Sequence, residues 1–173
     1  MRAVKHVTPF ASPVLLTPHA GEMAKLSDSR KETVQAHPQQ TARKAAHEWN
    51  AVVALKGAIT HIGAPDQRVW RHQGGNVGLA ISGSGDVLAG LVAGLVARGA
   101  TLEQAAAWGV ALHARAGEKL AERFGPLGYL ARELAAEVPG VMAGLGIRAS
   151  PAQSLASAAG MLRIGTPPRR RRH

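Results

Sequence analysis

Apolar and polar positions in the first third of the chain follow two kinds of pattern. Residues 14–17 form a short apolar run that a proline closes, which predicts a buried strand ending in a loop. Residues 38–50 begin with proline and repeat small apolar residues at helical spacing, which predicts a helix. Residues 51–56 are almost continuously apolar, as in a strand covered on both faces. A helical start over 22–26 and a polar connection over 27–37 complete a strand, helix, strand unit.

The following segments predict a β-hairpin that leads into a glycine-rich loop. Residues 59–62 and 68–71 have strand composition, and a turn with proline and aspartate separates them. Glycines then gather between residues 74 and 85. We therefore expect an α/β fold, with a mostly parallel sheet flanked by helices and a β-hairpin before the glycine-rich loop.

Helices dominate the chain beyond that loop. Apolar residues recur on one stripe over 86–99, which predicts a helix that ends near a glycine. Thr101 and Gln104 have the spacing of a capping box at the start of another helix. A last helix is predicted over 127–138, where Pro139 would stop it.

The C-terminal segment differs in composition from the rest. Residues 143–173 are rich in Ala, Ser, Gly, Pro and Arg, which predicts a disordered basic tail after a single domain over 1–142. The net charge of +10 belongs largely to this tail, because six of the 21 basic residues and none of the 11 acidic residues follow residue 147. A solvated tail is favoured over a module that binds RNA or DNA, since no stacking aromatics alternate with the arginines.

Composition excludes several further classes. The 173 residues, of which 46% are apolar, suffice for one core. The chain has no cysteine, which excludes disulfides, a thiolate nucleophile and a cysteine zinc site. No apolar run approaches the roughly 18–20 residues that span a bilayer, and no signal segment is recognisable. We expect a cytoplasmic protein without membrane contact, and the histidines have no spacing that predicts a metal site.

The segment Gly83-Ser84-Gly85-Asp86 carries the strongest chemical signal. Glycines let the backbone approach a ligand closely, and the helix that follows presents free N–H groups at its positive end. Such a turn binds phosphate. Asp86 could accept a proton from an attacking hydroxyl during phosphoryl transfer, or it could simply cap the helix.

Two predicted strand ends carry further polar residues. Lys56 to Thr60 leave the end of a buried strand, where ligands collect in open α/β sheets. The alternative is a solvated lysine before a turn glycine. His19 and Glu22 follow the other strand and would face the same crevice, although each residue type also occurs as a surface residue or at a helix start.

Three motifs occur together in this order and resemble those of one family. They are residues 16–23, residues 53–60, and residues 75–80 with 83–90. Together they resemble the ADP-dependent NAD(P)H-hydrate dehydratases, which have a ribokinase-like fold. The likeness covers roughly residues 12–142.

This resemblance implies an activity and a set of site residues. Members of the family remove water from NADHX or NADPHX, the hydrated nicotinamide nucleotides, and they use ADP or ATP with Mg²⁺ on the phosphates. By motif matching, His19 and Asp86 would contact the hydrate, with Asp86 as the catalytic base. The nucleotide would be held by Lys56, Gly57, Ala58, Ile59, Thr60, Gly83, Ser84 and Gly85.

The sequence departs from the family pattern in several respects. The longer N-terminal half is missing, which implies a truncated chain or a partner that supplies that half. Leu79 replaces the usual methionine, and the basic tail has no counterpart in the family. Full-length relatives are expected to be homo-oligomers. A different ribokinase-like small-molecule kinase is the alternative enzyme, although it would not account for the Thr-Pro-His-Ala-Gly-Glu segment at residues 17–22.

Overall fold

The computed structural model describes residues 7–12 and 14–145. The elements in chain order are β1 (Val14–Leu16), α1 (Ala20–Leu26), α2 (Lys31–Ala36), α3 (Pro38–Trp49), β2 (Ala51–Leu55), β3 (Ile59–Gly63), β4 (Val69–Gln73), η1 (Val77–Ala80), α4 (Ser84–Ala97), α5 (Leu102–Phe124) and α6 (Ala131–Leu145). Of the predicted tail, residues 143–145 lie at the end of α6, and the remainder falls outside the described residues.

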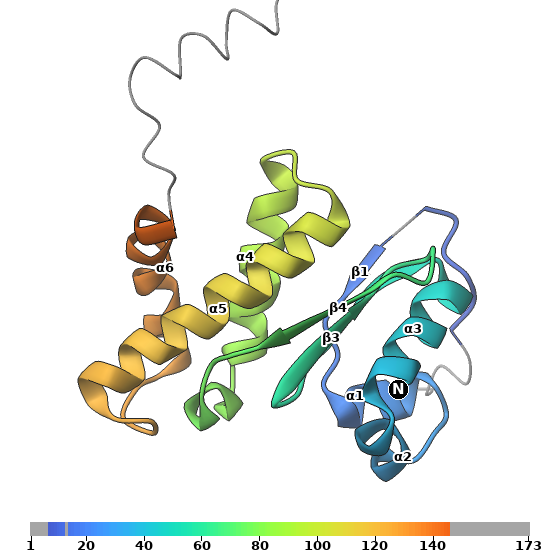
Figure 1. Ribbon diagram of the computed structural model, residues 1–173, viewed down its shortest axis with the longest axis horizontal. Coiled ribbons are helices and arrows are strands. Elements are labelled where there is room, and N and C mark those ends of the chain that lie inside the picture. The colour runs from blue at the N-terminus through green and yellow to red at the C-terminus, as the bar shows by residue number, and fades with distance from the viewer. Residues whose placement is uncertain (1–6, 13, 146–173) are drawn as a thin grey trace, which may run out of the picture. The chain divides into compact units, whose positions relative to one another are not determined.

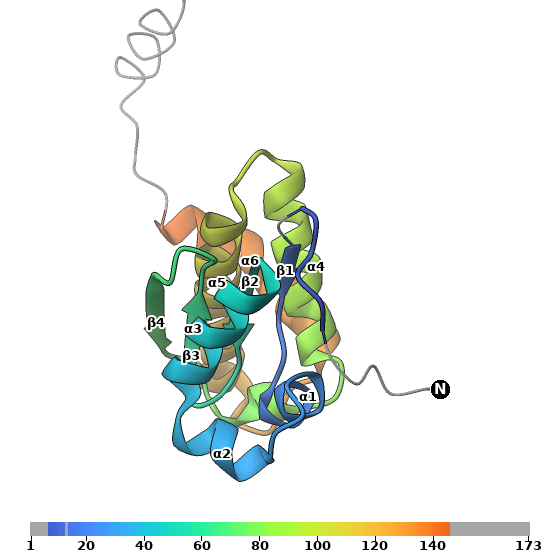
Figure 2. The same cartoon turned by 90° about the vertical axis from the view of Figure 1, so that its right-hand side faces the viewer.

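The four described strands form one sheet in the order β1-β2-β3-β4. Figure 2 shows β1 and β4 at its two edges. β1 and β2 are parallel and are joined through the helical segment α1 to α3, as the strand, helix, strand prediction requires. β3 and β4 form the predicted hairpin, and β2 pairs with β3 in antiparallel orientation. The α/β prediction is confirmed, but parallel pairing does not predominate among these strands, because the hairpin supplies half of them.

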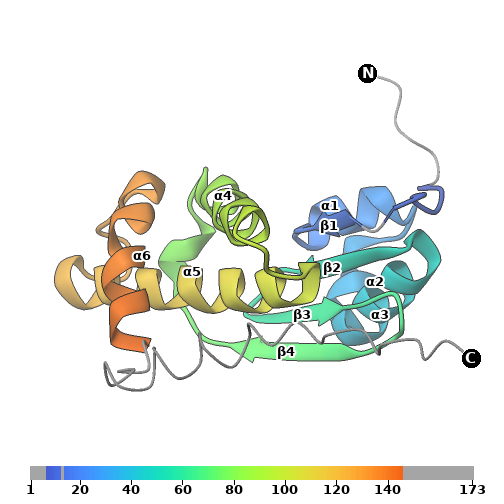
Figure 3. The same ribbon diagram turned by 90° about the horizontal axis from the view of Figure 1, so that it is seen from above.

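Strand β2 separates two layers of helices. All five of its residues are buried. Ala51, Val53 and Leu55 pack in a cluster with α1, α2 and α3, whereas Val52 and Ala54 pack with α4 and α5. Because successive side chains of a strand point to opposite faces, an apolar run fits this position. Figures 1 and 3 show α1 to α3 on one side of the sheet and α4 and α5 on the other.

The predicted stop of the last helix at Pro139 is wrong, because α6 continues through it. A proline inside a helix removes one backbone hydrogen bond, at a cost of about 3 kcal/mol. Leu134, Val138 and Val141 form the buried stripe of α6 and pack with α5. We attribute the continuation to this packing, which offsets the local cost.

Other differences concern helix starts and one short helix. Both α1 and α4 begin two residues before the predicted positions, at Ala20 and Ser84. Helix α2 lies within the predicted polar connection, where Val34 is its single buried residue, so its sequence has no apolar stripe. The Thr101–Gln104 capping box is confirmed. None of the helices in the described part of the chain is long and apolar enough to cross a membrane.

Candidate active site

One cavity of about 690 Å³ gathers most of the predicted site residues. Its walls come from the start of α1, the end of β2, the hairpin, η1, and helices α4 and α5. Seven predicted residues line it, namely His19, Lys56, Gly57, Ala58, Thr60, Ser84 and Gly85. Ile59, Gly83 and Asp86 belong to the same segments but do not line the cavity.

A main-chain contact brings the first two segments together. The Lys56 N–H donates a hydrogen bond of 2.8 Å to the Pro18 carbonyl oxygen, and His19 and Lys56 form an isolated parallel bridge. This bridge continues the pairing of β1 with β2 beyond the strand ends. Parallel strands end at the same edge of a sheet, where ligands bind in open α/β folds, so residues distant in sequence share one wall.

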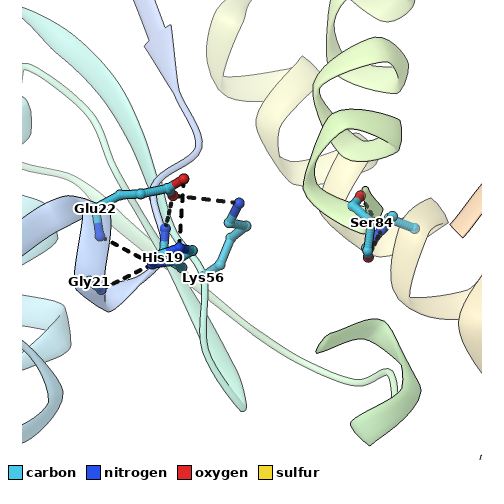
Figure 4. A network of polar contacts seen from close by, with 6 residues as sticks. His19, Gly21, Glu22, Lys56 and Ser84 are labelled. Atoms are coloured by element: carbon cyan, nitrogen blue, oxygen red, sulfur yellow. Dashed lines mark hydrogen bonds and ion pairs between the residues drawn. The ribbon is translucent and has the colours of Figure 1, made fainter. Parts of the chain in front are cut away.

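His19 is the N-cap of α1. Its Nδ1 accepts hydrogen bonds from the N–H groups of Gly21 and Glu22, at 3.0 and 3.1 Å. The Glu22 carboxylate in turn accepts from the His19 N–H at 2.8 Å and lies 4.0 Å from Lys56 Nζ, as Figure 4 shows. The side chains of His19 and Glu22 therefore close a capping box and at the same time border the position of the Lys56 ammonium.

The Lys56 ammonium lies beside the glycine-rich turn. A Cβ atom placed on Gly85 would be 2.9 Å from Lys56 Nζ, and Figure 4 shows Lys56 extending toward the start of α4. Gly85 belongs to the first turn of α4. In this turn the N–H groups of Ser84 and Asp86 donate to the carbonyl oxygens of Ile81 and Gly83, and the Gly85 N–H has no backbone partner among the described residues. The positive end of the helix and a lysine thus meet at one point, which suits a phosphate or another anion.

Gly83 shapes this turn. It is the N-cap of α4 with φ +84° and ψ −12°, a region that L-residues with a side chain seldom adopt. The Ser84 side chain behind it is buried and contacts His113 of α5, whose Nε2 lies 3.0 Å from Ser84 Oγ and 3.0 Å from the Ser84 carbonyl oxygen. Burial lowers the pKa of His113, and the charge of Lys56 adds to this effect, while the contact with Ser84 opposes it.

Asp86 occupies the third position of α4 and is exposed. The N-cap of α4 makes no side-chain hydrogen bond, and the Asp86 carboxylate has no hydrogen-bond partner among the described residues. The geometry therefore does not show Asp86 capping the helix by a hydrogen bond. It leaves the carboxylate free at the solvent side of the turn, next to Gly85.

The cavity also contains residues to which the sequence analysis assigned no role. His72, Asn76 and His113 line it. The Asn76 Oδ1 accepts hydrogen bonds from the Gly78 N–H and the Tyr129 hydroxyl. Asn76 Nδ2 and His72 Nε2 are buried and have no protein partner among the described residues. Asn76 belongs to the motif at residues 75–80, but a histidine in the middle of α5 gives no sequence signal.

Two further cavities of the described part of the chain are lined by none of the predicted site residues. The first, of about 430 Å³, is bordered mainly by α3 and by the end of α1 with the residues that follow it. Within residues 7–12 and 14–145, no three side chains of the metal-binding types are grouped closely enough to hold a metal ion. Any magnesium here would depend on phosphate oxygens and water, rather than on protein side chains, for most of its coordination.

Comparison with known proteins identifies the family. The family model for NAD(P)H-hydrate dehydratases matches residues 1–140. The chain belongs to the NAD(P)H-hydrate dehydratase family. It is 50% identical over 134 residues to the ADP-dependent (S)-NAD(P)H-hydrate dehydratase of Xanthomonas campestris pv. campestris, an alignment that covers 78% of this chain and 46% of that protein.

Solved structures agree with this membership. The ADP/ATP-dependent NAD(P)H-hydrate dehydratase of Bacillus subtilis, co-crystallised with ATP and Mg²⁺, matches with a TM-score of 0.78 and 28% identity, over 82% of this chain and 52% of that chain. A ribokinase-like superfamily protein of Enterococcus faecalis matches with a TM-score of 0.64 and 30% identity, over 79% of this chain and 46% of that one. The predicted partial ribokinase-like fold is therefore confirmed, and the dehydratase-family chain spans about half the length of these relatives.

Proposed function

We propose that this chain carries the nucleotide-binding part of an ADP-dependent NAD(P)H-hydrate dehydratase. The observation that carries the proposal is the position of Lys56 Nζ beside Gly85 at the start of α4. An ammonium group and a helix N-terminus at one cavity wall stabilise a phosphate. Lys56 to Thr60 and Gly83 to Gly85 would hold the adenine nucleotide, with His19 and Asp86 directed to the hydrate.

The proposed chemistry makes a poor leaving group into a good one. The hydroxyl oxygen of the hydrated nicotinamide ring attacks the β-phosphorus of ADP, and AMP leaves as the P–O bond breaks. Asp86 accepts the proton of the attacking hydroxyl. The ring C–O bond then breaks to release phosphate, and the neighbouring ring carbon loses a proton to restore the double bond of NADH or NADPH. Hydroxide is replaced by phosphate as the leaving group, which lowers the barrier.

Magnesium fits this arrangement as a partner of the nucleotide. Mg²⁺ keeps several waters and binds through substrate phosphates with one or two carboxylates. No side chain of the described residues is assigned to the ion, which would be held by phosphate oxygens and water. When bound, the ion would neutralise charge on the phosphates.

Calorimetric titration with ADP tests the nucleotide site. Lys56→Gln should weaken ADP binding by roughly 10- to 100-fold, because a hydrogen bond to a charged group contributes about 1.5–3 kcal/mol. Lys25→Gln is the matched control, since Lys25 is an exposed lysine of α1 that does not line the cavity. Equal ADP affinity for the Lys56 and Lys25 variants would show that the phosphate binds elsewhere.

Activity measurements separate the dehydratase from a kinase. The chain is incubated with NADHX and ADP, with formation of the reduced nicotinamide followed by its near-ultraviolet absorbance, and separately with small hydroxyl compounds and ATP. In a full-length context that restores the missing N-terminal half, Asp86→Ala should reduce turnover by orders of magnitude while ADP binding stays largely intact. Product formation in the second set alone would reject the dehydratase proposal in favour of a ribokinase-like kinase. The nucleic-acid alternative depends on the arginines after residue 147, which lie outside the described residues.

A further inference from the structure

A buried histidine and a buried serine face each other at one wall of the nucleotide cavity. His113 belongs to α5 and Ser84 is the first residue of α4, and the two residues are 9% and 2% exposed. Both line the cavity. Figure 4 shows Ser84 at the start of α4, the helix toward which Lys56 extends. Because a buried polar group without a hydrogen-bond partner is costly in free energy, the protons of both side chains are expected to occupy the positions that make a hydrogen bond.

The contacts of His113 determine which ring nitrogen carries the proton. Its Nε2 lies 3.0 Å from the carbonyl oxygen of Ser84. A carbonyl oxygen can only accept a hydrogen bond, so Nε2 must be the donor. Burial lowers the pKa of His113, and the ring is therefore neutral at pH 7, with its single proton on Nε2 and none on Nδ1.

This tautomer determines what the Ser84 hydroxyl can do. The same Nε2 lies 3.0 Å from Ser84 Oγ, so the ring N–H is shared between the two oxygens of Ser84 and Oγ acts as an acceptor toward the ring. A hydroxyl has one proton to donate in addition to its two acceptor positions. Because Nε2 already carries a proton, the ring cannot accept the hydroxyl proton at this contact. No other protein partner of Ser84 Oγ occurs among the described residues, and the proton remains available to a ligand.

Two donors other than the Ser84 hydroxyl lie near this point, namely the Lys56 ammonium and the Gly85 N–H. Gly85 follows Ser84 in the first turn of α4 and lies beside the Lys56 ammonium. We propose that His113 is a positioning residue which holds Ser84 with its hydroxyl as a hydrogen-bond donor to a phosphate oxygen of the bound nucleotide. This inference rests on the proposed function only in taking the ligand to be an adenine nucleotide. His113 does not touch the ligand in this arrangement and acts through Ser84.

The tautomer of His113 can be measured without any ligand. In a ¹⁵N-labelled chain at pH 7.5, long-range ¹H–¹⁵N correlation spectra distinguish protonated from unprotonated ring nitrogens. We expect the His113 ring to carry its proton on Nε2, with Nδ1 unprotonated. A proton on Nδ1 would make Nε2 the acceptor of the Ser84 hydroxyl, which would overturn the inference.

Binding of three probes then tests the role of the pair. ADP, pyrophosphate and adenosine are titrated into the wild-type chain, His113→Leu, Ser84→Ala and the double variant. We expect each single variant to weaken ADP and pyrophosphate binding by roughly 10- to 100-fold and to leave adenosine binding unchanged. The double variant should lose no more than Ser84→Ala alone, because the two residues act through one hydrogen bond.

Two further variants control for damage to the fold. His61→Leu removes an equally buried histidine of β3 that does not line this cavity, and it should leave the affinity for all three probes unchanged. His113→Gln can place an amide N–H near the position of Nε2, and it should recover most of the ADP affinity if donation to Ser84 is what matters. Failure of this rescue together with equal losses for ADP and adenosine would indicate a merely structural role and overturn the inference.

The probes also separate this inference from the proposed function. Tight pyrophosphate binding that depends on His113 and Ser84, without ADP binding, would support the positioning role and reject the adenine-nucleotide assignment. ADP binding that Ser84→Ala leaves intact would reject the positioning role and retain the proposed function. Absence of both ADP and pyrophosphate binding would overturn both.

Discussion

Replacement of Gly83 by alanine tests the backbone conformation of the turn that we propose to bind phosphate. Gly83 is the N-cap of α4 and has φ +84°. A Cβ atom at this position would have Ala131 Cβ as its nearest neighbour, at 3.4 Å, which is an ordinary contact. The substitution therefore introduces backbone strain with almost no steric overlap, so its effect on the free energy of unfolding reports the backbone conformation of residue 83.

The expected magnitude follows from the positive φ. Placing an L-residue other than glycine in the left-handed region costs roughly 1–2 kcal/mol, so Gly83→Ala should lower the free energy of unfolding by about that amount. Gly90→Ala is the matched control on the same helix, because a Cβ on Gly90 meets nothing within 4 Å. Alanine is preferred to glycine inside a helix by about 0.8–1.0 kcal/mol, so this variant should be more stable than the wild type.

Urea unfolding followed by tryptophan fluorescence compares the two variants. The free energies of unfolding of Gly83→Ala and Gly90→Ala should differ by about 2–3 kcal/mol, with similar dependence on urea concentration. Gly83→Asn should fall between Gly83→Ala and the wild type, since asparagine tolerates the left-handed region. Similar unfolding midpoints for Gly83→Ala and Gly90→Ala would refute the assigned conformation of the turn.

Two further predictions concern packing and pH. Gly109→Ala would place a Cβ atom 2.6 Å from Val92 Cγ2 where α4 crosses α5. We therefore expect the free energy of unfolding, measured in urea, to fall by about 1–3 kcal/mol. The double variant with Val92→Ala should lose less stability than the sum of the two single variants. Additive losses would contradict this contact. Burial lowers the pKa of His61, His72 and His113, so the unfolded chain binds more protons below its ordinary histidine pKa of about 6.5. The free energy of unfolding should keep its full value above that pH and should decline as the pH falls toward the lowered pKa values of the folded state. A urea midpoint that does not change between pH 7.5 and 5.5 would contradict this prediction.

Elements whose pattern is local could be predicted from the sequence, whereas those that depend on packing could not. The apolar run of β2 and the capping box of Thr101 required no knowledge of neighbouring elements, and both were confirmed. Helix α2 has a single buried apolar residue, Val34. The passage of α6 through Pro139 depends on contacts with α5. A sequence pattern does not show how much burial an element gains from a distant partner, so these two features were missed.

The residues of the candidate site likewise include some that could be predicted from local sequence patterns and one that could not. Lys56 and Gly85 could be placed together in advance, because both follow rules for strand ends and helix starts in α/β folds, and the structure brings them into proximity. His113 could not be found, since it lies on α5 at a position that looks like any other helical residue. Its importance is visible only through its contact with Ser84.

The position of Asp86 explains how a carboxylate could lie next to the proposed phosphate site. Asp86 is exposed and does not line the cavity, whereas Lys56 and Gly85 do. At a solvent-exposed position the repulsion between two like charges 4 Å apart is only about 1 kcal/mol in water. A single hydrogen bond between a donor and a charged group contributes about 1.5–3 kcal/mol, so the donors inside the cavity outweigh this repulsion. A carboxylate at the solvent side of the turn would therefore permit the proposed phosphate binding and would remain accessible to a hydroxyl group that approaches the phosphorus from outside.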